Sequence, residues 1–119
     1  MERRVLVVED EDNIRSMMQT FLTRRGFAVE TAVDGQEGIE RMSDASYDVL
    51  VLDLMMPRVS GLGVLQYLDR ARPDMINHTV IATAYTGVLP ADQLRRVCRV
   101  IRKPFQLDEL LDAIESCAA

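Results

Sequence analysis

A chain of 119 residues with 48% hydrophobic and 28% charged side chains has the composition of one soluble globular domain. Its net charge of -5 argues against a nucleic-acid-binding surface, which requires a basic patch. No apolar run approaches the ~20 residues of a membrane span, and the first residues lead into a short strand without the features of a signal peptide. We therefore expect a soluble cytoplasmic protein that contacts neither nucleic acid nor a membrane directly.

The two cysteines, Cys98 and Cys117, are far apart in the sequence. Neither belongs to a cluster of histidines and cysteines at metal-binding spacing. In an intracellular protein such cysteines are usually reduced. The sequence therefore predicts two free thiols.

Five short, largely aliphatic segments alternate with segments whose apolar residues recur at helical spacing. Two of the short segments, 5–8 and 49–52, are uninterrupted aliphatic runs, which is typical of strands buried on both faces of a parallel sheet. Arg99 and Arg102 flank the last segment and indicate a strand at a sheet edge. The predicted strands are 5–8, 27–32, 47–53, 79–83 and a segment containing Val100 and Ile101.

Residues that start and stop helices lie between these strands. Asp12 or Asn13 is expected to cap the first helix, and Gly26 ends it in the left-handed position that favours glycine. Pro90 can open a short fourth helix as its first residue.

The apolar stripes of the predicted helices define their buried faces. Asp34-Gly35 and Ser60-Gly61 lead into the second and third helices, and the third ends before Pro73. The stripe residues are Ile14, Met17, Met18, Phe21 and Leu22, then Ile39 and Met42, then Leu62, Leu65 and Leu68, then Leu107, Leu110, Leu111 and Ile114. Strands and helices that alternate five times predict one α/β domain, 1–119, in which a doubly wound five-stranded parallel sheet has helices on both faces.

Polar residues follow four of the predicted strands. Because all strands of a parallel sheet end at one edge, these side chains should converge there, where open α/β sheets bind their ligands. They are Glu9-Asp10, Asp53, Thr83 and Lys103-Pro104.

Each of these residues also has an ordinary structural interpretation. Glu9 and Asp10 could favour the start of the following helix, Thr83 is a common strand residue, and Lys103 could be a surface charge. Their joint occurrence at four strand ends favours a site. His78 is expected to be exposed at the opposite end of the sheet.

Three carboxylates that lie close together need a compensating cation. Oxygen ligands without histidine or cysteine favour a hard divalent ion, and partly hydrated Mg²⁺ fits best. A lysine and a hydroxyl opposite such a metal form a receptor for a phosphoryl group, and a carboxylate is a known phosphoryl acceptor.

Four motifs in this order resemble the receiver domain of two-component response regulators over essentially the whole chain. They are Val-Glu-Asp, Leu-Asp-Leu-Met-Met-Pro, Ala-Thr-Ala and Lys-Pro-Phe. The resemblance to chemotaxis-type receivers implies a flavodoxin-like sheet with strand order 2-1-3-4-5.

The resemblance also implies a role for each acidic position. Asp53 would be the phosphorylated carboxylate. Asp10 would bind Mg²⁺ directly, with Glu9 helping, and Met55 would contribute its backbone carbonyl to the metal.

The other matching residues would contact the phosphoryl group. Lys103 would pair with a phosphoryl oxygen, with its position fixed by a cis bond to Pro104. Thr83 would move to donate a hydrogen bond, and Ala84 is small enough to leave access.

Such domains are not enzymes in the usual sense, because they accept a phosphoryl group on their own aspartate and later lose it. The donor is a histidine on a sensor kinase or a phosphotransfer protein. The added charge would switch the surface of helix 4, strand 5 and helix 5 toward an output domain or a downstream protein, or into a dimer. The chain would be a stand-alone receiver or the N-terminal part of a longer regulator.

The sequence departs from the family between the fourth and fifth strands. Val100 stands where an aromatic switch residue is usual, and Tyr85 has no assigned role. The usual Gly-Ala pair before the fifth strand is replaced by residues 96–99, and the interval from Thr83 to Lys103 is short. We therefore expect an atypical output face.

Three other classes are compared with this interpretation. A haloacid-dehalogenase-like phosphatase needs a cap domain and a second aspartate two residues after Asp53, where this chain has Met55. A Rossmann-type domain needs a glycine-rich loop after the first strand, where residues 9–12 are acidic. A phosphorylation-independent receiver that acts as an interaction module is the main alternative, because the switch region is atypical.

Overall fold

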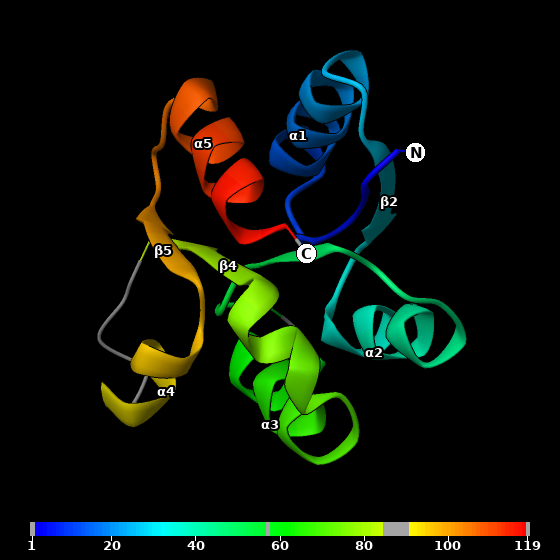
Figure 1. Ribbon diagram of the computed structural model, residues 1–119, viewed down its shortest axis with the longest axis vertical. Coiled ribbons are helices and arrows are strands. Elements are labelled where there is room, and N and C mark those ends of the chain that lie inside the picture. The colour runs from blue at the N-terminus through cyan, green and yellow to red at the C-terminus, as the bar shows by residue number, and fades with distance from the viewer. Residues whose placement is uncertain (1, 57, 85–90, 119) are drawn as a thin grey trace.

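The computed structural model describes residues 2–56, 58–84 and 91–118, and within them five parallel strands form one sheet (Figure 1). The order is β2-β1-β3-β4-β5, which confirms the expected topology and places β5 at an edge. The strands are β1 (Arg4–Val8), β2 (Ala28–Ala32), β3 (Val49–Leu52), β4 (Thr79–Thr83) and β5 (Arg99–Arg102).

Helices cover both faces of the sheet, with α1 and α5 on one side and α2, α3 and α4 on the other (Figure 1). In the described chain, no helix is both long and apolar enough to cross a membrane. The helices are α1 (Asp12–Arg24), α2 (Gly35–Asp44), α3 (Gly61–Ala71), α4 (Ala91–Arg96), α5 (Leu107–Cys117) and a 3-10 helix, η1 (Pro73–His78).

The aliphatic runs of β1 and β3 form the centre of the fold. Alternate residues of β3 point to opposite faces, so Val49 and Val51 pack beneath α1 and α5 while Leu50 and Leu52 pack against α2 and α3. All four are at most 1% exposed, and burial of such a side chain stabilises the fold by about 1.5–3 kcal/mol. These contacts fix the position of the carboxyl end of β3, where Asp53 follows.

The start of α1 differs from the prediction. Glu11 occupies the N-cap position without a side-chain cap bond, so neither Asp12 nor Asn13 caps the helix. The Glu11 N–H donates to the Glu9 carboxylate at 3.1 Å, and Asp12 pairs with Arg15 at 2.5 Å. The Asp12 carboxylate therefore pairs within the helix, and the Glu9 carboxylate at the strand end accepts the Glu11 N–H.

The segments around β4 contain one unpredicted element and one short helix. η1 begins at Pro73, and its six residues are too few to display a helical period. The described α4 has six residues, in keeping with the expected short helix, whereas Pro90 lies outside the described residues. Gly26 has a φ of 95°, which confirms the left-handed end of α1.

The prediction of two free thiols is wrong, because Cys98 and Cys117 form a disulfide. The chain reverses direction between β5 and α5, so the end of α5 returns to the start of β5. The two Cα atoms are 5.9 Å apart, a separation that a disulfide spans. His78 is half-buried rather than exposed, and its Nδ1 donates to the Cys117 carbonyl at 2.7 Å.

Candidate functional site

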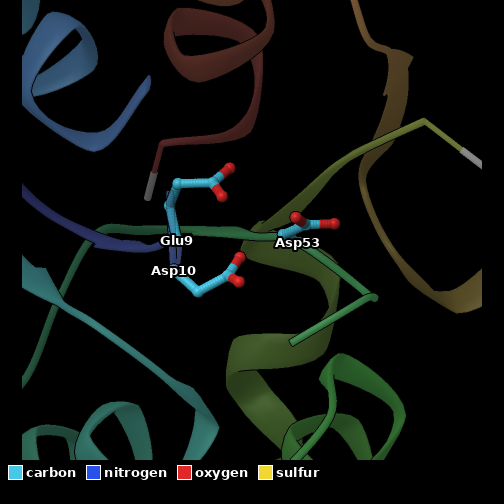
Figure 2. A group of neighbouring side chains, drawn as sticks. All are labelled: Glu9, Asp10 and Asp53. Carbon is cyan, nitrogen blue, oxygen red and sulfur yellow. The ribbon is translucent and has the colours of Figure 1, made fainter. Parts of the chain in front are cut away.

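Three carboxylates meet at the carboxyl end of the sheet. Glu9 and Asp10 follow β1, Asp53 follows β3, and the register pairs Val8 with Leu52 directly before them. One oxygen of each carboxylate lies within 4.8 Å of the others, and Figure 2 shows Glu9 and Asp10 directing their carboxylates toward the side where Asp53 lies. Glu9 and Asp53 are buried and Asp10 is exposed, so the group opens to solvent on one side.

Lys103 joins this group from the end of β5. Its Nζ donates to Glu9 Oε1 at 2.5 Å and to Asp53 Oδ2 at 2.9 Å. Its own N–H donates to the Thr83 carbonyl at 3.0 Å, and its peptide bond to Pro104 is cis as expected. The predicted convergence of Glu9, Asp10, Asp53 and Lys103 is therefore confirmed as geometry.

The electrostatics of this cluster follow from burial and pairing. Burial raises the pKa of Glu9, and the hydrogen bond from Lys103 offsets part of that rise. Burial lowers the pKa of Lys103, but its bonds to Glu9 and Asp53 outweigh that effect and leave the pKa raised. Lys103 is therefore a cation at neutral pH.

The donor set fits a hard divalent cation. Three carboxylates and one ammonium leave two formal negative charges when all are ionised, and every carboxylate donor is an oxygen. These are the properties of a Mg²⁺ site. Met55 lies two residues beyond Asp53, and its N–H donates to Asp53 Oδ1 at 3.2 Å, which brings its backbone to the same turn.

The loop after Asp53 is tightly anchored. A Cβ on Gly61 would overlap the carbonyl oxygen of Asp53, so only glycine fits there. Arg58 has a left-handed φ of 63°, and its Nε donates to Asp34 Oδ2 at 2.6 Å. This bond from Arg58, together with the bond from the Glu37 N–H, lowers the pKa of Asp34.

The Asp34–Arg58 pair was missed by sequence reasoning. The Asp34-Gly35 turn was visible, but its partner lies 24 residues away in a loop without periodicity. Because Asp34 also caps α2, the pair ties the loop after Asp53 to the start of that helix.

Thr83 and Ala84 lie at the end of β4 beside Lys103. Thr83 is fully buried and Ala84 is exposed. Ala84 borders a cavity of about 490 Å³, which is lined by Glu11, Ile14, Met17, Ala84, Lys103, Pro104 and Phe105. Lys103 therefore borders an open cavity as well as the acidic group.

The switch region is described only in part. Val100 is half-buried and packs against the core cluster on the α2–α3 face. Its register partner in β4 is Ile81. Tyr85 lies outside the described residues.

A sequence profile of the response regulator receiver domain matches residues 5–115. The chain belongs to this family. The transcriptional regulatory protein DltR of Streptococcus agalactiae is 38% identical over 117 residues, which cover 93% of this chain and 50% of DltR.

Solved receiver structures have the same fold over nearly the whole chain. The response regulator TrrA of Thermotoga maritima, in complex with Mg²⁺ and BeF, is 30% identical with a TM-score of 0.86 and covers 98% of this chain and 99% of its own. TrrA in complex with the histidine kinase ThkA is 29% identical, has a TM-score of 0.85 and covers 100% of both chains. This receiver domain spans about half the length of the first curated relatives that it matches.

Proposed function

We propose that this receiver domain accepts a phosphoryl group on Asp53 from a histidine of a partner protein. The observation that carries the proposal is the position of the buried Asp53 carboxylate, 2.9 Å from Lys103 and beside Glu9 and Asp10. One cation and several carboxylates around one acceptor suit a transfer in which positioning and electrostatics dominate.

The transfer forms a bond between an Asp53 oxygen and phosphorus and breaks the bond between phosphorus and the donor nitrogen. The donor imidazole leaves with its electron pair and takes up a proton. Lys103 releases Asp53 and pairs with a phosphoryl oxygen, because the new group carries more negative charge than the carboxylate. Hydrolysis of the acyl phosphate later restores Asp53.

Asp10 and Asp53, assisted by Glu9 and the backbone carbonyl of Met55, would hold Mg²⁺. When bound, the ion neutralises negative charge on the carboxylates and on the incoming phosphoryl oxygens. The rest of the chemistry belongs to the residues of this chain.

Thr83 would carry the signal from the phosphoryl group into the fold. Its hydroxyl donates to a phosphoryl oxygen, and the exposed Ala84 beside it leaves room for the donor. The response would spread over the face formed by α4, β5 and α5, where an output domain, a downstream protein or a second copy would bind. Val100 in place of an aromatic residue would make this response atypical.

The partner would be a sensor histidine kinase or a histidine phosphotransfer protein in the cytoplasm. The structure of TrrA in complex with ThkA supports this choice. The cavity beside Lys103 adds apolar contacts through Ile14, Met17 and Phe105. The chain would act alone or as the N-terminal part of a transcriptional regulator, as the name of DltR suggests.

Intact mass spectrometry after incubation with Mg²⁺ and acetyl phosphate tests the proposal. We expect one Mg²⁺-dependent phosphoryl adduct, none on Asp53→Asn, and the same adduct on Asp44→Asn, which removes an exposed carboxylate outside the site. An adduct that persists on Asp53→Asn would contradict the assignment.

The alternative is a receiver that binds partners without phosphorylation, which the substitution of Val100 favours. It predicts no adduct on the folded protein, from acetyl phosphate or from a phosphorylated kinase.

Amide spectra with and without beryllofluoride test the expectation of an atypical output face. The usual set of shifts across residues 86–103 would contradict that expectation.

A further inference from the structure

The disulfide lies on the face proposed for output, at the opposite end of β5 from Lys103. Cys98 directly precedes β5, and Cys117 is the last residue of α5. The Cys98 N–H also donates to the Thr79 carbonyl of β4 at 2.9 Å. The bond therefore fixes the end of α5 to the edge of the sheet.

Few other polar contacts hold this end of α5. Arg99 and Asp112 form an ion pair at 3.3 Å whose side chains are 39% and 70% exposed, so it contributes little. His78 donates to the Cys117 carbonyl at 2.7 Å. Ala113 and Ile114 are fully buried, so apolar packing would keep α5 on the sheet without the covalent bond.

The two sulfurs differ in their surroundings. Cys117 is 1% exposed and packs in the core cluster beneath α1 and α5, whereas Cys98 is only half-buried. Cys98 is therefore the residue that a thiolate from solvent would reach first. The geometry assigns separate roles to the two residues in an exchange reaction.

We propose that Cys98–Cys117 is a reversible thiol–disulfide exchange site, used by dithiol proteins, that sets how firmly α5 is held against β5. The regulatory part rests on the proposed function. Disulfides are rare in cytoplasmic proteins of mesophiles and are there mostly transient, catalytic or redox-sensing. For a receiver that works in the cytoplasm, as proposed above, a disulfide on the output face fits the last of these classes.

The exchange proceeds in two balanced steps. One thiolate of the reductant attacks Cys98 Sγ, a mixed disulfide forms, and Cys117 leaves as a thiolate that takes up a proton. The second thiolate of the reductant then attacks the reductant sulfur that is bound to Cys98. The reductant closes its own disulfide, and Cys98 leaves as a thiolate that takes up a proton. The receiver gains two electrons and two protons, and the dithiol becomes a disulfide.

Reduction should loosen the end of α5 and leave the phosphorylation site unchanged, because that site lies at the other end of β5. The native oxidised protein is treated with dithiothreitol or reduced thioredoxin, and free thiols are counted by mass after alkylation. We expect two thiols, and amide exchange in α5 that is faster by about tenfold or more, while the amide chemical shifts of the residues at the phosphorylation site are unchanged.

A thioredoxin variant that retains only its attacking cysteine identifies the sulfur that reacts. Peptide mapping should find the mixed disulfide on Cys98. The double variant Cys98→Ser, Cys117→Ser is the matched control, and its exchange should not respond to dithiol. A mixed disulfide on Cys117, reduction only in urea, or α5 exchange that is equal in both redox states would overturn the proposal.

Phosphorylation of both redox forms separates this inference from the proposed function. Equal adducts on both forms support the separation of the two ends of β5. If neither form accepts a phosphoryl group, the proposed function fails, and the thiol counts and exchange rates still decide the redox site.

Discussion

The two ends of β5 are held in different ways. After the strand, Lys103 is bound by hydrogen bonds to Glu9 and Asp53, so this end is sensitive to changes in charge at the carboxylate group. Before the strand, Cys98 is bound covalently to Cys117, so this end is sensitive to reduction of the disulfide. An edge strand of four residues thus separates two kinds of control, and variants at each end should affect only one of them.

Lys103→Met is expected to have the largest effect on stability. It leaves Glu9 and Asp53 buried without their cation, and the loss of one partner from a buried pair costs about 3–5 kcal/mol. Urea unfolding at neutral pH measures the loss. Arg102→Met removes an exposed cation next to it and should change stability by less than about 0.5 kcal/mol. Equal losses for the two variants would contradict the role of Lys103.

Loss of the disulfide is expected to rank second. Cys98→Ser with Cys117→Ser frees a cross-link between residues 19 apart, which costs about 3 kcal/mol in the chain-entropy account. The same urea measurement gives the change, and Mg²⁺ affinity by calorimetry should stay within about twofold of the wild type. A larger fall in Mg²⁺ affinity would show that the ends of β5 are coupled.

Tyr47→Phe sharpens the comparison at the opposite edge of the sheet. Tyr47 Oη donates to Glu30 Oε1 at 2.8 Å, and loss of this bond should cost about 1 kcal/mol at pH 7. Burial, followed by the bond to Glu30, raises the pKa of Tyr47 to about 12. The unfolded chain ionises from about pH 10, so wild-type stability should fall between pH 10 and 12.

That alkaline loss should shrink in Tyr47→Phe and persist in Tyr67→Phe, the matched control. Denaturant midpoints from pH 8 to 11 provide the measurement. Dithiol should not alter the effect, because this edge has no disulfide among its described residues. An alkaline loss that is equal in all three proteins would contradict the assignment.

The smallest expected effect is the coupling between the two ends of β5. Residues 98 and 103 are about 16 Å apart along an extended strand. Lys103→Met combined with the two serine substitutions should lose the sum of the separate losses within about 0.5 kcal/mol. A larger deviation would mean that the strand transmits strain between its ends.

Sequence patterns predicted the sheet and most of the site for physical reasons. Buried parallel strands such as β3 display continuous aliphatic runs, and parallel order brings Asp10, Asp53 and Lys103 to one edge. These inferences need only periodicity and topology. The roles of the site residues stay predictions until phosphorylation is measured.

The features that were missed depend on contacts between distant segments. Cys98 and Cys117 come together only through the reversal between β5 and α5, and general knowledge of intracellular cysteines favoured the wrong redox state. The Arg58 partner of Asp34 likewise requires the loop and α2 to be placed first. The prediction of the α1 cap was wrong because the carboxylates near the start of the helix have other partners. Glu9 accepts the Glu11 N–H, and Asp12 pairs with Arg15.

The edge position of β5 also bears on aggregation. An uncovered edge strand offers unpaired backbone groups to a second molecule, and charged side chains are a common protection. Arg99 and Arg102 stand at the two ends of this strand, so a second copy that added its own β5 would bring like charges together. Self-association of this domain at high concentration should therefore not join β5 to the β5 of a second copy.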